Sequence, residues 1–210
     1  MKQIMYSSSE IRPTKGYLID LKRRIVFIES GYELLKLKRD YLAKELTITI
    51  ESFRGKRSIV ITKLREIYKE LAAANVVLGP IEVKGYALSL KGHLEIEILP
   101  KSIMGVNYPY IKIISKPQLV DNLDIMLKQL IDQISEVFIQ VIKLAELETK
   151  IVRIAEDLAK TNRKVNVLRD IIIPTYNNRI KSITEKLDEE TLEELVRMKI
   201  SRRILEGHVQ

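Results

Sequence analysis

Few side chains of this 210-residue sequence have the types and spacing that chemistry needs. His93 falls in a predicted turn and His208 in the C-terminal tail, and neither has a second ligand at a metal-binding spacing. GKRS at 55–58 resembles a phosphate loop only superficially, because the upstream glycine and preceding strand are missing. The acidic runs at 188–190 and 193–194 lie on a charged helix without a predicted cleft. We therefore expect no catalytic residue, no metal and no cofactor.

Basic side chains remain, and their chemistry is ion pairing with acidic partners. They form two groups, one early and one late in the chain: Lys22, Arg23 and Arg24, then Arg197, Lys199, Arg202 and Arg203. The net charge of +8 favours nucleic acid, anionic lipid or an acidic protein surface as a partner. Because 28 acidic residues are interspersed with 36 basic ones, a solvated helix surface of mixed charge stays an open alternative.

The composition is typical of long helices. Hydrophobic residues make up 46% and charged residues 30%, with only 8 glycines and 6 prolines. The lack of cysteine excludes disulfides and favours a reducing compartment such as the cytoplasm. No stretch of about 18 apolar residues is present, so we expect a soluble protein without direct membrane insertion.

Hydrophobic periodicity predicts a first helix over residues 12–75, after a loose tail at 1–11. Pro13 suits the first helical turn, and VVLGP at 76–80 suits the end. Apolar residues recur in alternating steps of three and four, which predicts a coiled-coil seam and a helix that continues through Gly55. The seam residues are Leu18, Leu21, Ile25, Ile28, Tyr32 and Leu35.

Residues 76–117 read as a small β insert, because HLEIEIL alternates apolar and acidic residues and YIKII is rich in β-formers. Either KGH at 91–93 or GVNYP at 105–109 could form a turn, so the strand pairing stays open.

A second helical period over residues 118–205 supplies the other half of the seam. Its seam residues are Leu147, Ile151, Ile154, Leu158, Val165 and Leu168. Around Pro174 the spacing becomes successive fours, which predicts a relaxed supercoil and a kink.

These elements predict a mainly α fold: one elongated domain made of a long antiparallel two-helix coiled coil with a β-hairpin insert opposite the termini. The helices are expected to measure about 90 Å and about 130 Å at 1.5 Å per residue. With one tight reversal between them, the antiparallel helices would place residues whose numbers sum to about 193 opposite each other. Examples are Tyr32 with Thr161 and Ile19 with Pro174.

Several motifs resemble the D subunit of the archaeal A-type and V-type ATP synthases. RPTKGYLIDLKRRI and GYELLKLKRDYL are similar to its N-terminal signature, and LEIEILPKSIMGVNYP is similar to its β insert. LAELETKI and NRKVNVLRDIIIPTYNNRIKSITEKLDEE follow in the family's order. The segment TLEELVRMKISRRI departs from the family pattern, which is richer in Arg and Phe.

The resemblance implies a noncatalytic rotor axle, or central stalk, that transmits torque between the membrane ion-translocating ring and the catalytic hexamer during ATP synthesis or hydrolysis. The implied partners are the A and B subunits of the hexamer, the F subunit beside the coiled coil, and the socket-forming C subunit at the foot. The implied location is peripheral, at the cytoplasmic face of the cell membrane. The resemblance leaves open whether the coupled ion is H⁺ or Na⁺.

The resemblance also implies that the end with both termini enters the hexamer. The hexamer would then surround this end as a bearing. The basic residues expected to face the bearing are Arg12, Lys15, Lys22, Arg23, Arg24, Arg197, Lys199, Arg202 and Arg203. A second apolar edge on the later helix, at Phe138, Ile142 and Ala145, is expected to need the F subunit as a cover.

The alternative functions are a coiled-coil nucleic-acid-binding protein and a membrane-surface or scaffold coiled coil. The first predicts an affinity that falls steeply with salt. The second needs an exposed apolar face beside a basic one, whereas the seam here consumes the apolar stripe. As a rotor axle, the chain is expected to have no nucleic acid among its partners.

Overall fold

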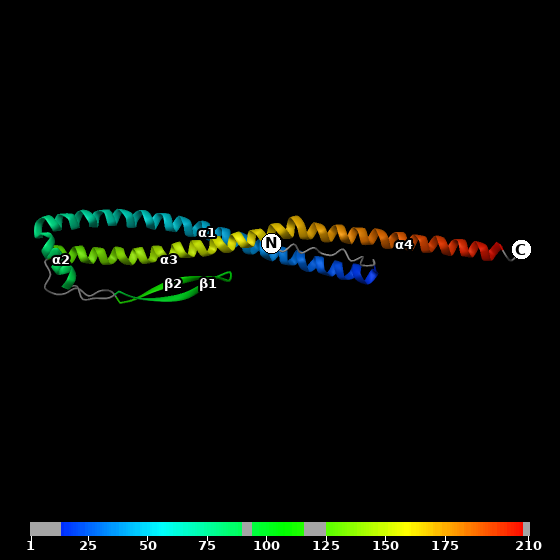
Figure 1. Cartoon of the computed structure of the whole chain (residues 1–210), viewed down its shortest axis with the longest axis horizontal. Helices are drawn as coiled ribbons and strands as arrows, with labels where there is room; N and C mark the ends of the chain where they lie inside the picture. Colours follow the sequence, from blue (N-terminus) through cyan, green and yellow to red (C-terminus); the bar gives the residue numbers. More distant parts are fainter. Residues whose placement is uncertain (1–13, 90–93, 116–124, 208–210) are drawn as a thin grey trace. The chain divides into compact units, whose positions relative to one another are not determined.

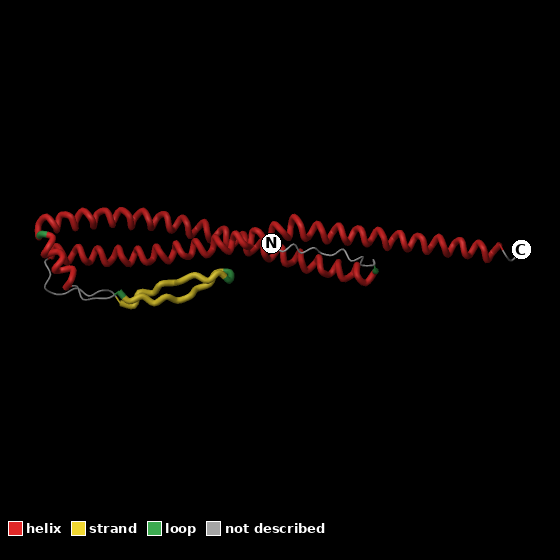
Figure 2. Tube along the Cα trace, viewed as in Figure 1, coloured by secondary structure: helices red, strands yellow, loops and turns green. Residues whose placement is uncertain are grey.

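The computed structural model describes residues 14–89, 94–115 and 125–207 (Figure 1). The predicted tail at 1–11, Arg12, the KGH turn with His93, residues 118–124 and His208 lie outside the described residues. Helices dominate the described chain, and two strands form the only sheet within it, as Figure 2 shows. The predicted fold class, a mainly α chain with long helices and a small antiparallel β-hairpin, is confirmed.

The chain begins with α1 (Lys15–Leu78), which runs through Gly55 as one helix of 64 residues. It is followed by α2 (Pro80–Ser89), β1 (Glu95–Ile103) and β2 (Val106–Ser115). The second long helical segment consists of α3 (Ile125–Val167), the π-helical turn η1 (Leu168–Ile172) and α4 (Ile173–Gly207).

The region 76–117 is only partly β, because helix occupies residues 76–78 and 80–89. Gly79 adopts a φ of +83°, the left-handed conformation that commonly ends a helix. Pro80 then occupies the first position of α2, where its missing N–H costs no hydrogen bond. The glycine–proline pair therefore ends one helix, as expected, but also starts another that the strand pattern did not predict.

The described residues fall into two compact units. Unit 1 comprises Met1–Leu37 with Thr161–Gln210, and unit 2 comprises Lys38–Lys160. The expectation of one elongated domain stays a prediction.

In unit 2, α1 and α3 pack antiparallel through apolar side chains at helical spacing. One buried cluster contains Val60, Ile67, Ala74, Leu127, Leu130 and Val137. Tyr86 of α2 packs against this cluster, so α2 covers the end of the helix pair. A second cluster joins Leu42 of α1, Ile154 of α3 and Val106 of the hairpin.

The helix register in unit 2 is shifted only slightly from the predicted one. Lys38 forms an ion pair with Asp157 at 2.7 Å, where the prediction places Ala155. Glu45 accepts from Lys150 at 2.7 Å, where the prediction places Glu148. The residue numbers of these two pairs sum to 195, and those of the pair Lys63 and Glu136 sum to 199, so the observed register lies slightly above the predicted sum of about 193. The pairs predicted in unit 1 stay predictions.

The hairpin closes through a two-residue turn at Met104 and Gly105, both with positive φ. Such a turn matches the right-handed twist of paired strands. The turn therefore overlaps the predicted GVNYP alternative only at Gly105, and the other residues of that motif belong to β2. Pro100 and Pro109 face each other across the strands, and neither has an N–H to offer at a strand edge.

Unit 1 contains the first part of α1 and the segment that includes η1 and α4. Its buried side chains are Leu21, Ile25, Thr161, Val165 and Ile183. Figure 1 shows that α4 continues past the beginning of α1. From residue 188 to 204 every side chain is exposed, so this part of α4 has no packing partner within the described residues.

The irregularity predicted around Pro174 takes the form of the π-helical turn η1. Ile173 N–H donates to the carbonyl of Leu168, five residues back. A proline ring clashes with the carbonyl four residues before it, which here belongs to Asp170, and a wider turn relieves that clash. Thr175 Oγ1 donates to the carbonyl of Ile171. The successive fours in the sequence are therefore the spacing of a locally widened helix.

We predict that Leu42→Ala destabilises the chain by about 2–5 kcal/mol, because Leu42 is fully buried and its removal leaves a cavity. Leu34→Ala is a matched control on the same helix, since Leu34 is 68% exposed, and should cost about 0.5 kcal/mol or less. Urea unfolding followed by circular dichroism measures both. Equal costs would contradict the assignment of Leu42 to the core.

We also predict that Asp170 titrates below the usual aspartate range. Its hydrogen bond from Arg169, at 2.7 Å, lowers the pKa of Asp170, and the charge of Arg169 lowers it further. Because the folded-state pKa is lowered, any stabilisation by this pair is present above the ordinary aspartate pKa and is lost as the pH falls through the lowered pKa. NMR titration should show the pKa rising in Arg169→Leu and unchanged in Arg179→Leu. A pKa unaffected by Arg169→Leu would refute the pairing.

Candidate interaction surfaces

The twelve predicted seam residues are all buried or half buried. Leu21, Ile25, Ile154 and Val165 are buried, and the other eight are half buried: Leu18, Ile28, Tyr32, Leu35, Leu147, Ile151, Leu158 and Leu168. A pair of helices must shield these positions from water. The seam residues therefore hold the helices together and do not themselves form a binding site.

The described bearing candidates are all exposed, and they occupy two sections of unit 1. Lys15, Lys22, Arg23 and Arg24 lie on α1, and Arg197, Lys199, Arg202 and Arg203 lie on the part of α4 that continues past it. Arg24 is paired with Asp20 at 2.9 Å and Arg197 with Glu193 at 3.3 Å. The structure therefore spreads these cations along unit 1 and does not gather the two groups into one patch.

The terminal section of α4, residues 191–204, exposes many apolar side chains in unit 1. Its exposed apolar residues are Leu192, Leu195, Val196, Met198, Ile200 and Ile204. At 100° per residue, the row from Leu192 to Ile204 and the pair Leu195 and Met198 together occupy most sides of the helix. Six charged side chains share this section with them, so the exposed apolar groups are spread around the helix and do not form one stripe that a single flat partner would cover. The sequence signal for this surface is the segment TLEELVRMKISRRI, in which apolar and charged residues are interspersed.

A second exposed apolar surface lies at the reversal end of unit 2, where α1, α2 and α3 meet (Figure 1). Its residues are Val76, Val77, Ile81, Leu88 and Ile125, each at least 70% exposed. Exposed apolar side chains at one end of a helix pair are candidates for contact with a partner. Periodicity could not reveal this surface, because α2 was expected to be strand.

The outer edge of α3 is a third surface. Phe138 and Val152 are exposed on it, as is Ala145, whereas Ile142 is half buried. Phe138, Ala145 and Val152 repeat every seven residues, which is the spacing of a helix-contacting stripe.

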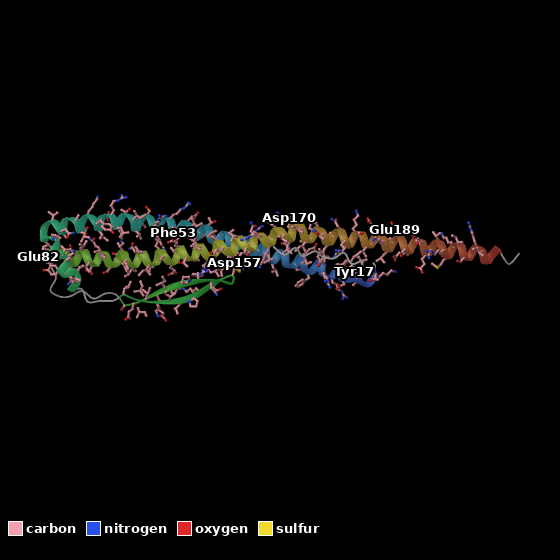
Figure 3. All side chains as sticks on the ribbon, viewed as in Figure 1. Tyr17, Phe53, Glu82, Asp157, Asp170 and Glu189 are labelled. Atoms are coloured by element: carbon pink, nitrogen blue, oxygen red, sulfur yellow. The ribbon has the colours of Figure 1, made fainter. Side chains whose placement is uncertain are left out.

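The acidic runs on α4 do not form a reactive arrangement. Residues 188–190 and 193–194 are all exposed, and Glu193 is used in the pair with Arg197. Among the described residues, no three His, Asp or Glu side chains are placed to hold a metal ion. In the same part of the chain, no helix combines the length and the apolar character needed to cross a membrane. Figure 3 shows Asp157 of unit 2 and Glu189 of unit 1 on their helices.

Long paired helices with uncovered apolar surfaces define a component of an assembly whose partners are other proteins. The family model for the D subunit of ATP synthase matches residues 17–203. The A-type ATP synthase D subunit of Pyrococcus horikoshii is 35% identical over 208 residues, covering 94% of this chain and 96% of the relative. The corresponding protein of Methanosphaera stadtmanae is 33% identical, covering 92% and 94%, and that of Methanopyrus kandleri is 32% identical, covering 94% and 88%.

The chain belongs to the family of ATP synthase D subunits. It is a noncatalytic subunit of the A-type ATP synthase, and the resemblance identified from the sequence motifs is confirmed.

Proposed function

We propose that the chain is the central-stalk axle of its ATP synthase and transmits torque between the ion-translocating membrane ring and the catalytic hexamer. The observation that carries this proposal is the terminal section of α4. An exposed helix with apolar side chains on most sides fits a sleeve that surrounds it, whereas a flat partner would cover only one side. The central cavity of a hexamer of A and B subunits is such a sleeve.

The proposed contacts with the hexamer are spread over many side chains. Lys15, Lys22 and Arg23 are exposed cations on α1, and Lys199 and Arg203 are exposed on α4. Exposed ion pairs each contribute about 0–1 kcal/mol, so many of them can hold the axle without trapping one rotational angle. Arg12, Arg24, Arg197 and Arg202 complete the proposed set.

The other two surfaces suit the remaining partners. The reversal end of unit 2 offers apolar side chains to the socket-forming C subunit, and the outer edge of α3 at Phe138, Ile142 and Ala145 offers a stripe to the F subunit. Through these contacts the chain is held peripherally at the cytoplasmic face of the membrane as part of the complex.

Coupling follows from asymmetry. Two helices with different sequences present a different surface to each catalytic interface at each angle. A conformational equilibrium shifts only by the difference in binding energy between its states. Rotation of the axle therefore changes nucleotide affinity at successive interfaces without any bond-making by the chain itself.

Val196→Glu tests the proposal. Because Val196 is exposed in the chain, helix content should be unchanged, but burying an unpaired carboxylate in the sleeve should weaken binding to the A–B hexamer at least about tenfold. Ile59→Glu, at a similarly exposed position of unit 2, is the matched control and should bind normally. Titration of purified hexamer measures both. Unchanged binding by Val196→Glu would refute insertion of α4.

A further inference from the structure

The hairpin is fixed to the helices of unit 2 through one strand edge and its turn. Ile111 N–H donates to Glu146 Oε2 at 3.1 Å, so this edge of β2 faces α3. Val106 is buried with Leu42 and Ile154. Lys150 Nζ pairs with Glu45 and lies 5.4 Å from the centre of the Tyr108 ring. A two-stranded hairpin is marginal by itself, so these contacts give it a defined position.

This position creates a groove between the hairpin and α3. The groove has a volume of about 420 Å³. Its lining residues are Ile98, Pro100, Asn107, Tyr108, Pro109 and Arg153. Four of these six side chains offer mainly apolar surface, and Arg153 places a positive charge beside them.

Arg153 is a cation without a carboxylate in the described part of the chain. It forms no ion pair there, although acidic side chains lie one and two turns away along α3. Asp157 is engaged by Lys38 at 2.7 Å, and Glu146 accepts the N–H of Ile111. The neighbouring cation Lys150 is already neutralised by Glu45. Exposed Glu156 also lies one turn from Arg153, but no ion pair joins them, so the guanidinium of Arg153 stays available at the groove and matches a carboxylate in shape and charge.

The way a ligand can bind is restricted by the strands. Pro100 has no N–H, so an added strand would lose a hydrogen bond at the middle of β1, and the β2 edge at Ile111 already faces α3. Recognition must then rely on side chains: an apolar group against the two prolines and Tyr108, and a carboxylate against Arg153.

We propose that this groove is a docking site for an acidic segment of another protein of the complex, in which an Asp or Glu adjoins an apolar side chain. The inference rests on the proposed function for the presence of such a partner. It adds a contact made by the hairpin side of unit 2, separate from the three surfaces assigned above.

Zero-length carbodiimide cross-linking of the assembled complex tests this proposal. A carbodiimide joins a lysine amine to a carboxylate that it touches, so Arg153→Lys makes the contact detectable, and mass spectrometry identifies the carboxylate. We expect the introduced lysine to cross-link to an Asp or Glu next to an apolar residue on a different protein of the complex. Lys143, an exposed lysine on the same helix, is the matched control and should cross-link at least about tenfold less.

Arg153→Glu provides a second readout. It should raise the dissociation rate of the contacting protein about tenfold, whereas Lys143→Glu should leave that rate unchanged. The groove proposal is overturned if the complex assembles but the introduced lysine cross-links no more than Lys143, or only to this chain or a second copy of it. Failure of the unmodified chain to assemble would instead contradict the proposed function.

Discussion

Burial of regularly spaced apolar side chains between long helices is the interaction on which the rest of the structure depends. Leu42, Ile154 and Val165 are fully buried although the chain has no thick core. A helix as long as α1 gains little from propensity alone, and most of its stability comes from packing along one face. The ion pairs of unit 2 at Lys38 and Glu45 lie beside that packing and help to set the register.

A seam that covers only one face leaves the remaining apolar groups without a partner. In unit 1 these groups are concentrated on the terminal section of α4, and in unit 2 at the reversal end and the outer edge of α3. For an isolated protein such exposure would be a liability for aggregation. For a component of an assembly it is the means of attachment, which is why the family identity and the exposed surfaces support the same function.

Periodicity was enough to predict the helices and the seam, because a 3.5-residue repeat reports directly which face is buried. It failed at 80–89, where the local pattern near Gly79 and Pro80 is compatible with a new helix, and it gave the helix register only approximately, because the exact register depends on how α2 and the hairpin use the intervening chain. The hairpin groove was unpredictable for the same reason: Arg153 and Pro100 meet only through tertiary packing. The described basic residues proposed for the bearing are exposed, but exposure does not identify what they bind, so their role stays a prediction.

The most direct measurement is hydrogen exchange of the α4 backbone amides at 191–204, in the free chain and in a one-to-one complex with the A–B hexamer. Insertion into a surrounding sleeve predicts rapid exchange in the free chain and strong protection on all sides of this helix in the complex. A one-to-one complex in which these amides exchange as rapidly as in the free chain would contradict the account.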